Sequence, residues 1–162
     1  MKQIWEATDF VRNLQRRLRF GELSRAPLKL LRLELRAEEA ECEWMARPAD
    51  PWDADLPPGV GERHASSQAL EDCLAVRRLL FSAMPSVSRA VFRVYRGIQA
   101  NHVELIITGT VTREDQAAIN VCSLAMRAQL CGLRFCLADG VLGRFQSELW
   151  PGGETRQPVT PG

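Results

Sequence analysis

The sequence predicts an α+β fold: an antiparallel sheet of four to five strands with two helices packed on one face, plus an N-terminal amphipathic helix. Apolar and polar residues alternate in four segments, residues 30–36, 40–46, 90–95 and 103–110, which is the period of half-buried strands. In the segments before and between these runs, apolar residues recur at helical spacing. The order helix, strand, strand, helix, strand, strand, helix, strand is consistent with a ferredoxin-like βαββαβ arrangement.

The first expected helix is basic on one side and apolar on the other. Phe10, Leu14 and Leu18 recur at helical spacing, and Thr8 or Asp9 is a suitable N-cap, so we expect a helix from there to Phe20. Its opposite side carries three arginines at the same spacing, which makes it amphipathic. They are Arg12, Arg16 and Arg19.

The segment from residue 28 to residue 46 contains two alternating runs. In the first, Leu31, Leu33 and Leu35 alternate with charged residues, and the second run resumes after residues 37–39. We expect two strands here, joined as a hairpin or as one strand broken by a bulge. In the βαββαβ arrangement the first strand is interior, so residues 30–36 would have to join it as one bent strand or lie elsewhere.

Residues 47–65 combine four prolines, two glycines and three aspartates around Trp52, which predicts an unusually long loop. A second helix is expected to begin with Ser66 or Ser67 as N-cap and to end before Pro85, with Asp72 and Arg77 on its solvent side.

The region 84–139 reads as strand, strand, helix, strand. Its helix is expected to run from an N-cap at Thr112 to Cys131 and to end at Gly132. Asp139 and Gly140 form a turn dipeptide before a short return strand to Phe145. We divide the chain into an N-terminal helix with its connector (1–26), one α+β domain (27–146) and a disordered tail (147–162).

Charge is segregated along the chain although the net charge is only +1. Residues 1–36 hold nine basic and four acidic side chains, whereas residues 37–72 hold two basic and ten acidic ones. Opposite charges in one chain permit an intramolecular clasp and equally permit association between copies. This near-neutral balance argues against nucleic-acid binding, for which a basic surface is expected.

No motif in the sequence predicts catalysis, a cofactor or a metal. His64 and His102 have no partner at ligand spacing, and Cys131 and Cys136 lack a second pair that would complete a zinc site. The cluster Asp50, Asp53 and Asp55 lacks the glycine and glutamate of a calcium loop. We therefore lean against an enzyme.

The leading hypothesis is a small cytoplasmic domain that acts as a non-catalytic interaction or regulatory module, with a second copy or another protein as partner. The cytoplasm is expected because the chain has no apolar run of membrane-spanning length and an odd number of cysteines, five. The candidate partner contacts are charged or aromatic residues expected on exposed surfaces. They are Arg12, Arg16, Arg19, Trp52, Arg89, Arg93 and Tyr95.

Two alternatives stay open. One is a small-molecule-binding or enzymatic domain whose pocket lies under the 47–65 loop and is lined by Trp44, Trp52, His64 and Asp53. The other is nucleic-acid binding through the arginine-rich helix, which would make affinity fall steeply with salt.

Overall fold

A computed structural model describes residues 2–114 and 123–146 of the chain. It confirms the α+β class, with three α-helices and a six-stranded sheet in the described part. In chain order the elements are α1 (Lys2–Arg17), β1 (Lys29–Arg36), β2 (Glu39–Met45), the 3-10 helix η1 (Pro51–Asp55), α2 (Val60–Ala83), β3 (Arg89–Gln99), β4 (His102–Thr112), α3 (Leu124–Leu130), β5 (Leu133–Ala138) and β6 (Val141–Gly143).

The strands lie in the sheet in the order in which they occur in the chain, β1 to β6. The sheet is therefore larger than the predicted four to five strands. It is also mixed rather than antiparallel, because β2 and β3 are parallel neighbours joined by the crossover helix α2, while every other neighbouring pair is antiparallel. The ferredoxin-like order is not confirmed, since that arrangement does not place these two strands side by side.

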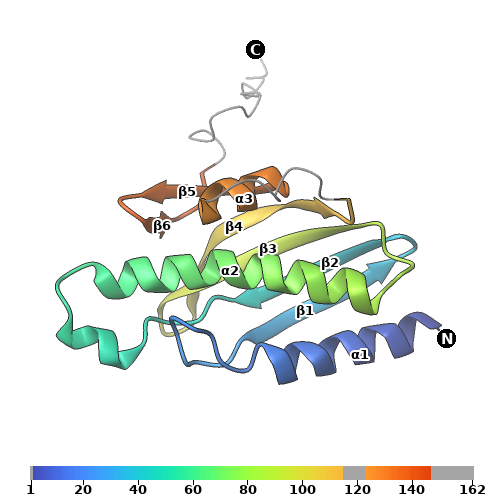
Figure 1. Ribbon diagram of the computed structural model, residues 1–162, viewed down its shortest axis with the longest axis horizontal. Coiled ribbons are helices and arrows are strands. Elements are labelled where there is room, and N and C mark those ends of the chain that lie inside the picture. Colours follow the sequence, from blue (N-terminus) through green and yellow to red (C-terminus); the bar gives the residue numbers. More distant parts are fainter. Residues whose placement is uncertain (1, 115–122, 147–162) are drawn as a thin grey trace, which may run out of the picture.

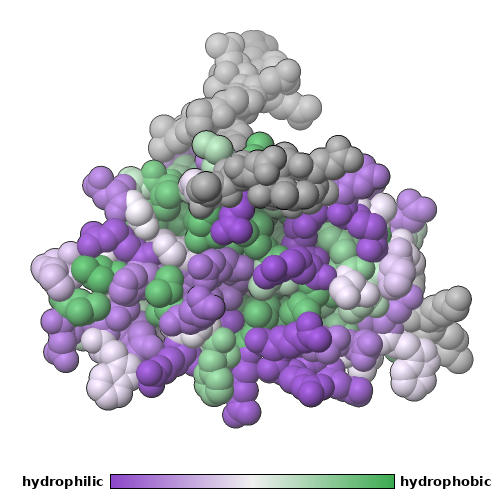
Figure 2. All heavy atoms as spheres, viewed as in Figure 1, coloured by the Kyte–Doolittle hydropathy of each residue, from purple (hydrophilic) through white to green (hydrophobic). Residues whose placement is uncertain are grey.

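Among the described residues, the helices cover one face of the sheet and leave the other open. Figure 1 shows α1 and α2 in front of the strands, with α3 above them beside β5. The core lies between these layers and includes Phe10 and Leu14 from α1 together with Trp44 and Phe92 from the sheet, all at most 1% exposed. Figure 2, in the same view, shows that hydrophilic side chains gather where α1 faces away from the sheet.

Both long helices begin earlier than the sequence predicts. Thr8 lies inside α1, and its hydroxyl donates to the Ile4 carbonyl instead of capping a helix. In α2 the N-cap is Gly59, at φ +87° and without a side-chain capping bond, and Ser66 is a mid-helix residue. The hydroxyl of Ser66 accepts a hydrogen bond from the Leu142 amide, which ties α2 to β6. The predicted loop at 47–65 is shortened accordingly.

β1 and β2 form a tight hairpin, which decides between the two predicted arrangements. Arg36 pairs with Glu39 across a turn in which Ala37 has a φ of +49°. The predicted faces are corrected at one position, because the register shifts between Leu30 and Arg32. Leu31 is consequently 46% exposed, and Leu30 packs against the core in its place.

The predictions for the C-terminal part are confirmed at the end of the helix and at the turn that follows β5, but not at the predicted N-cap. Thr112 is the last residue of β4, and the N-cap of α3 is Ser123, whose hydroxyl accepts a hydrogen bond from the Met126 amide. The return strand, predicted to reach Phe145, ends at Gly143. α3 ends before Gly132, which has a φ of +105°, and Asp139 and Gly140 form the turn between β5 and β6. The first part of the helix predicted from Thr112, at residues 115–122, and the predicted tail at 147–162 lie outside the described residues.

A buried ion pair fastens the segment that follows α1. The side chains of Arg47 and Asp72 are 0% and 2% exposed, and Arg47 Nε donates to Asp72 Oδ2 at 2.8 Å. The other guanidinium nitrogens donate to Asp72 Oδ1 and to the carbonyl oxygens of Leu18, Arg19 and Ala26. Asp72 and Arg77, predicted on the solvent side of the helix, are instead buried.

Candidate interaction surface

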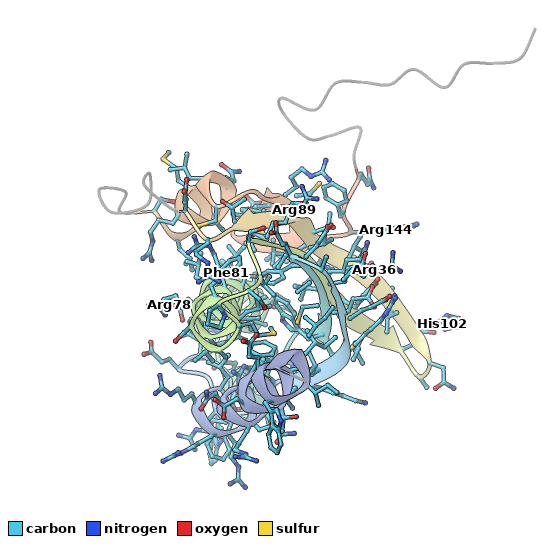
Figure 3. The ribbon with its side chains drawn as sticks, turned by 90° about the vertical axis from the view of Figure 1, so that its right-hand side faces the viewer. Arg36, Arg78, Phe81, Arg89, His102 and Arg144 are labelled. Carbon is cyan, nitrogen blue, oxygen red and sulfur yellow. The ribbon has the colours of Figure 1, made fainter. Side chains whose placement is uncertain are left out.

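The open face of the sheet brings three of the predicted contact residues together. Arg89, Arg93 and Tyr95 alternate along β3 with the buried Ala90, Phe92 and Val94 and therefore point away from the helices. Figure 3 shows Arg89 and Arg36 on the side of the sheet opposite Arg78 of α2. These residues belong to one surface because the neighbouring strands carry their polar side chains on the same face.

Charges on this open face are paired with one another. β1, β2 and β3 present four arginines and four glutamates, which are Arg32, Arg36, Arg89, Arg93, Glu34, Glu39, Glu41 and Glu43. Arg93 Nη1 and the Tyr95 hydroxyl both donate to Glu43 Oε1, at 3.3 and 3.2 Å. Burial and the adjacent Glu43 carboxylate raise the pKa of Tyr95. The surface is therefore a neutral, patterned lattice rather than a basic patch.

At the edge strand the lattice continues along β1. Glu34 accepts hydrogen bonds from Arg32 and, at 2.8 Å, from Arg36, and these two arginines lower the pKa of the Glu34 carboxyl. The sequence prediction treated these residues only as a wet strand face. The alternating charges of Arg32, Glu34 and Arg36, two residues apart, could have been recognised in the sequence. That β1 is an edge strand could not.

The remaining predicted contacts lie elsewhere. Arg12, Arg16 and Arg19 are exposed on or just after α1, on the helical side of the sheet, and Trp52 is 72% exposed on η1. The structure therefore does not unite the arginine-rich helix with the β3 residues into one surface.

A shallow apolar groove runs between α1 and β1. It is lined by Ile4, Ala7 and Thr8 of the helix and by Leu33 and Leu35 of the strand. Ile4 is 68% exposed and its neighbour Trp5 is 74% exposed. Within the described ranges, β1 has a strand partner on one side only, so this groove borders a free sheet edge.

A separate hollow of about 480 Å³ lies at the end of the sheet, beneath the segment that connects β2 to α2. Ala46, Pro48, Ala65 and Ile106 supply apolar walls, and Lys29, Glu62 and Arg96 supply charged groups. None of the four predicted lining residues takes part. Trp44 is fully buried in the core, Trp52 is exposed, and His64 Nδ1 contacts Asp53 Oδ2 at 3.1 Å outside the hollow.

Two cysteines of the described core, Cys42 and Cys73, are fully buried. Burial raises the pKa values of the Cys42 and Cys73 thiols well above the ordinary value, which keeps them protonated and unreactive. In the part of the chain that the structure describes, no group of three His, Cys, Asp or Glu side chains is placed to hold a metal ion.

Fold and surface together define an α+β domain with a mixed sheet, one helical face and one open, charge-patterned face. Comparisons with protein-family models, with curated proteins and with solved structures each return no match. Among the described helices, none has both the length and the apolarity needed to cross a bilayer.

Proposed function

We propose that this chain is a non-catalytic interaction or regulatory module that associates with a second copy of itself. The observation that carries this proposal is the edge of β1, which has no strand partner on one side among the described residues and lies next to the exposed apolar side chain of Ile4. An uncovered strand edge presents unpaired backbone donors and acceptors to another chain, and natural proteins usually cover or protect such edges. The neutral lattice on the adjoining face adds no net repulsion between copies.

Sedimentation velocity across the micromolar range tests the proposal. The sedimentation coefficient should rise with concentration from the monomer to the dimer value, because association follows mass action. Raising the salt concentration should change the dissociation constant only modestly, since exposed ion pairs are weak and screened. A strict monomer at all concentrations would contradict the proposal.

A second candidate function is supported by the 480 Å³ hollow, which falls in the size range of small-molecule sites. Its apolar walls together with Lys29 suit a small apolar molecule that carries an anionic group, whereas Arg96 is paired with Glu104 and Glu62 carries a negative charge. A thermal-shift screen against metabolites tests this idea. A ligand at 100 times its dissociation constant should stabilise the fold by about 2.7 kcal/mol.

Two substitutions in α2 provide the control for that screen. Ala65→Leu fills part of the hollow and should abolish the ligand-induced shift, whereas Ser82→Leu adds similar bulk at an exposed position of the same helix and should preserve it. A ligand that stabilises both variants equally binds elsewhere, and a screen without any shift counts against this second function.

A further inference from the structure

When residues 31–35 of the edge strand β1 are reversed about Leu33, leucines fall on leucines and charges fall on opposite charges. Residues 31–35 read Leu-Arg-Leu-Glu-Leu, with Leu33 at the centre. From Arg32 onward the strand alternates regularly, with Leu33 and Leu35 packed toward the helices and Arg32 and Glu34 on the open face. An antiparallel pairing of two such strands therefore places like faces together and opposite charges opposite one another.

We propose that two copies of the chain pair through β1, antiparallel and about a two-fold axis at Leu33, to form one continuous sheet. This inference rests on the proposed function, because it specifies the surface by which the copies associate. In this register Arg32 of each copy faces Glu34 of the other, and the two Leu33 side chains meet on the helical side. Such an isologous contact closes after two copies.

Charge selects this register over its neighbours. A shift by one residue would set buried leucines against charged residues on the opposite face, because side chains alternate with a period of two. Shifts that keep the faces matched centre the axis on Arg32 or on Glu34. The first sets Arg32 against Arg32, and the second sets Glu34 against Glu34 and Arg32 against Arg36. An axis at Leu35 would also oppose unlike charges, Glu34 against Arg36, but β1 ends at Arg36, so it would pair only residues 34–36 of the strand. The axis at Leu33 opposes Arg32 to Glu34 and pairs residues 30–36, and directly opposed like charges are destabilising.

The helix α1 adds an apolar contact on one side of the joined strands. The groove that contains Ile4 and Ala7 is floored by Leu33 and Leu35, so it lies directly beside the proposed axis. A second copy would bring its own Leu33 and Leu35 to the same place and extend that floor. Ile4, which is 68% exposed in the single chain, would then lose exposed area. This accounts for the exposed apolar side chain of Ile4.

Charge reversal tests the register. Arg32→Glu opposes glutamate to glutamate at both symmetry-related positions, and Glu34→Arg opposes arginine to arginine. Each variant alone should raise the dimer dissociation constant by about tenfold or more, measured by sedimentation. A mixture of the two variants, one of them carrying a fluorescent label, should form a heterodimer, because each position then opposes unlike charges. The double variant R32E/E34R should again form a homodimer.

The matched control is Arg144→Glu. This change reverses the charge of an exposed arginine that follows β6, at the other edge of the sheet, so it should leave the dissociation constant unchanged. Dimers that persist with wild-type affinity in both single variants, or single variants that do not associate when mixed, would overturn the proposed pairing while self-association itself still stands. A monomeric wild type would overturn both.

A second measurement needs no variant. Hydrogen exchange of the wild-type chain should slow with rising protein concentration at residues 29–36 and near the start of α1, because the dimer adds backbone hydrogen bonds to β1. The hairpin of β5 and β6, at the other edge of the sheet, should exchange at the same rate at every concentration. Slowing confined to that hairpin or to the centre of the open face would overturn the inference.

Discussion

Arg47→Ala should lower the free energy of unfolding by about 3–5 kcal/mol, the usual cost of leaving one member of a buried ion pair without its partner. The loss is expected to be large because Asp72 is only 2% exposed and accepts from both Nε and Nη2 of Arg47. Total stabilities of domains this size are about 5–15 kcal/mol. Urea unfolding monitored by circular dichroism measures the difference.

The conservative variant Arg47→Lys should also be destabilised, though less than the alanine variant. A guanidinium has five N–H donors in a rigid planar fork, and the bonds of Arg47 to Asp72 and to the carbonyls of Leu18, Arg19 and Ala26 use all of them. An ammonium has three donors and cannot hold the same set. Lysine therefore keeps the charge but leaves carbonyl oxygens of the segment after α1 without donors.

The pH dependence gives the Arg47 prediction a distinctive signature. Burial raises the pKa of Asp72 above its ordinary value of 3.8, and Arg47 opposes that rise. Without Arg47 the pKa should rise further, so the folded variant takes up a proton at a higher pH than the unfolded chain does. Stability tied to that proton is lost as pH rises. Arg47→Ala should thus be less destabilising at about pH 5 than at about pH 8.

Arg93→Ala is the control for Arg47. Arg93 also pairs with glutamates, but its side chain is 32% exposed, and exposed pairs contribute about 0–1 kcal/mol. Equal losses from the two substitutions would mean that the buried clasp contributes no more than a surface pair. If Arg47→Ala does not fold, Arg47→Lys gives the measurable value.

The sequence predicted strand faces well because alternation is a local property. Cys42, Trp44 and Phe92 are buried as their positions in the pattern require, while Glu43 and Arg93 lie on the open face. The exceptions are Leu31 in β1 and, in β4, Val103, which is 54% exposed, and Ile106, which is buried. Both strands contain a register shift, whose position depends on how the strand pairs with its neighbour. Strand pairing depends on two segments, so the sequence of either segment alone does not predict it.

The order of strands could not be predicted for the same reason. Both the ferredoxin-like order and the observed one bury the same faces under helices, so periodicity does not distinguish them. The two orders differ in where the strand after α2 lies. In the observed order it pairs with β2, and in the ferredoxin-like order it lies one strand further away. The edge position of β1, and with it the surface proposed for association, therefore became visible only in the structure.

Polar residues with distant partners were the other source of error. Ser66 resembles an N-cap in sequence, yet its hydroxyl holds the amide of Leu142. Arg47 stands in a proline-rich stretch that predicted a solvated loop, and its partner Asp72 stood on an expected wet helix face. A local pattern cannot tell a cap or surface residue from one that binds a group elsewhere in the fold.

Gly132→Ala should lower the free energy of unfolding by about 2–4 kcal/mol, because it combines backbone strain with a steric clash. A Cβ atom at this position would lie 2.1 Å from the Thr110 carbonyl oxygen, and the φ of +105° is one that residues with a Cβ rarely adopt. The contact is reciprocal, since a Cβ on Gly109 would lie 2.2 Å from the Gly132 carbonyl oxygen. Backbone atoms form both contacts, so no flexible side chain can move aside.

The effect should concentrate where β4 meets β5. These strands pair through Ile107, Thr108 and Gly109 only, so a separation of the backbones at Gly132 acts on a short ladder. Hydrogen exchange in Gly132→Ala should therefore accelerate more in β5 and β6 than in β2 and β3, whose pairing runs over seven residue pairs. Urea unfolding gives the global loss and exchange gives its location.

Gly143→Ala separates the clash from the simple addition of a methyl group. A Cβ at Gly143 would lie 3.9 Å from the nearest atom, the Cys136 carbonyl oxygen, and the residue does not have a positive φ. Gly143 lies in a strand, a conformation that alanine can also adopt. Alanine has fewer conformations than glycine in the unfolded chain, so this variant should be neutral or slightly stabilised. Equal destabilisation by both substitutions would mean that the C-terminal hairpin tolerates no added bulk anywhere. A loss confined to Gly132→Ala would show that Gly132 has two roles. It ends α3, as the sequence predicts, and it also permits the close approach of two backbones that joins β5 to the sheet.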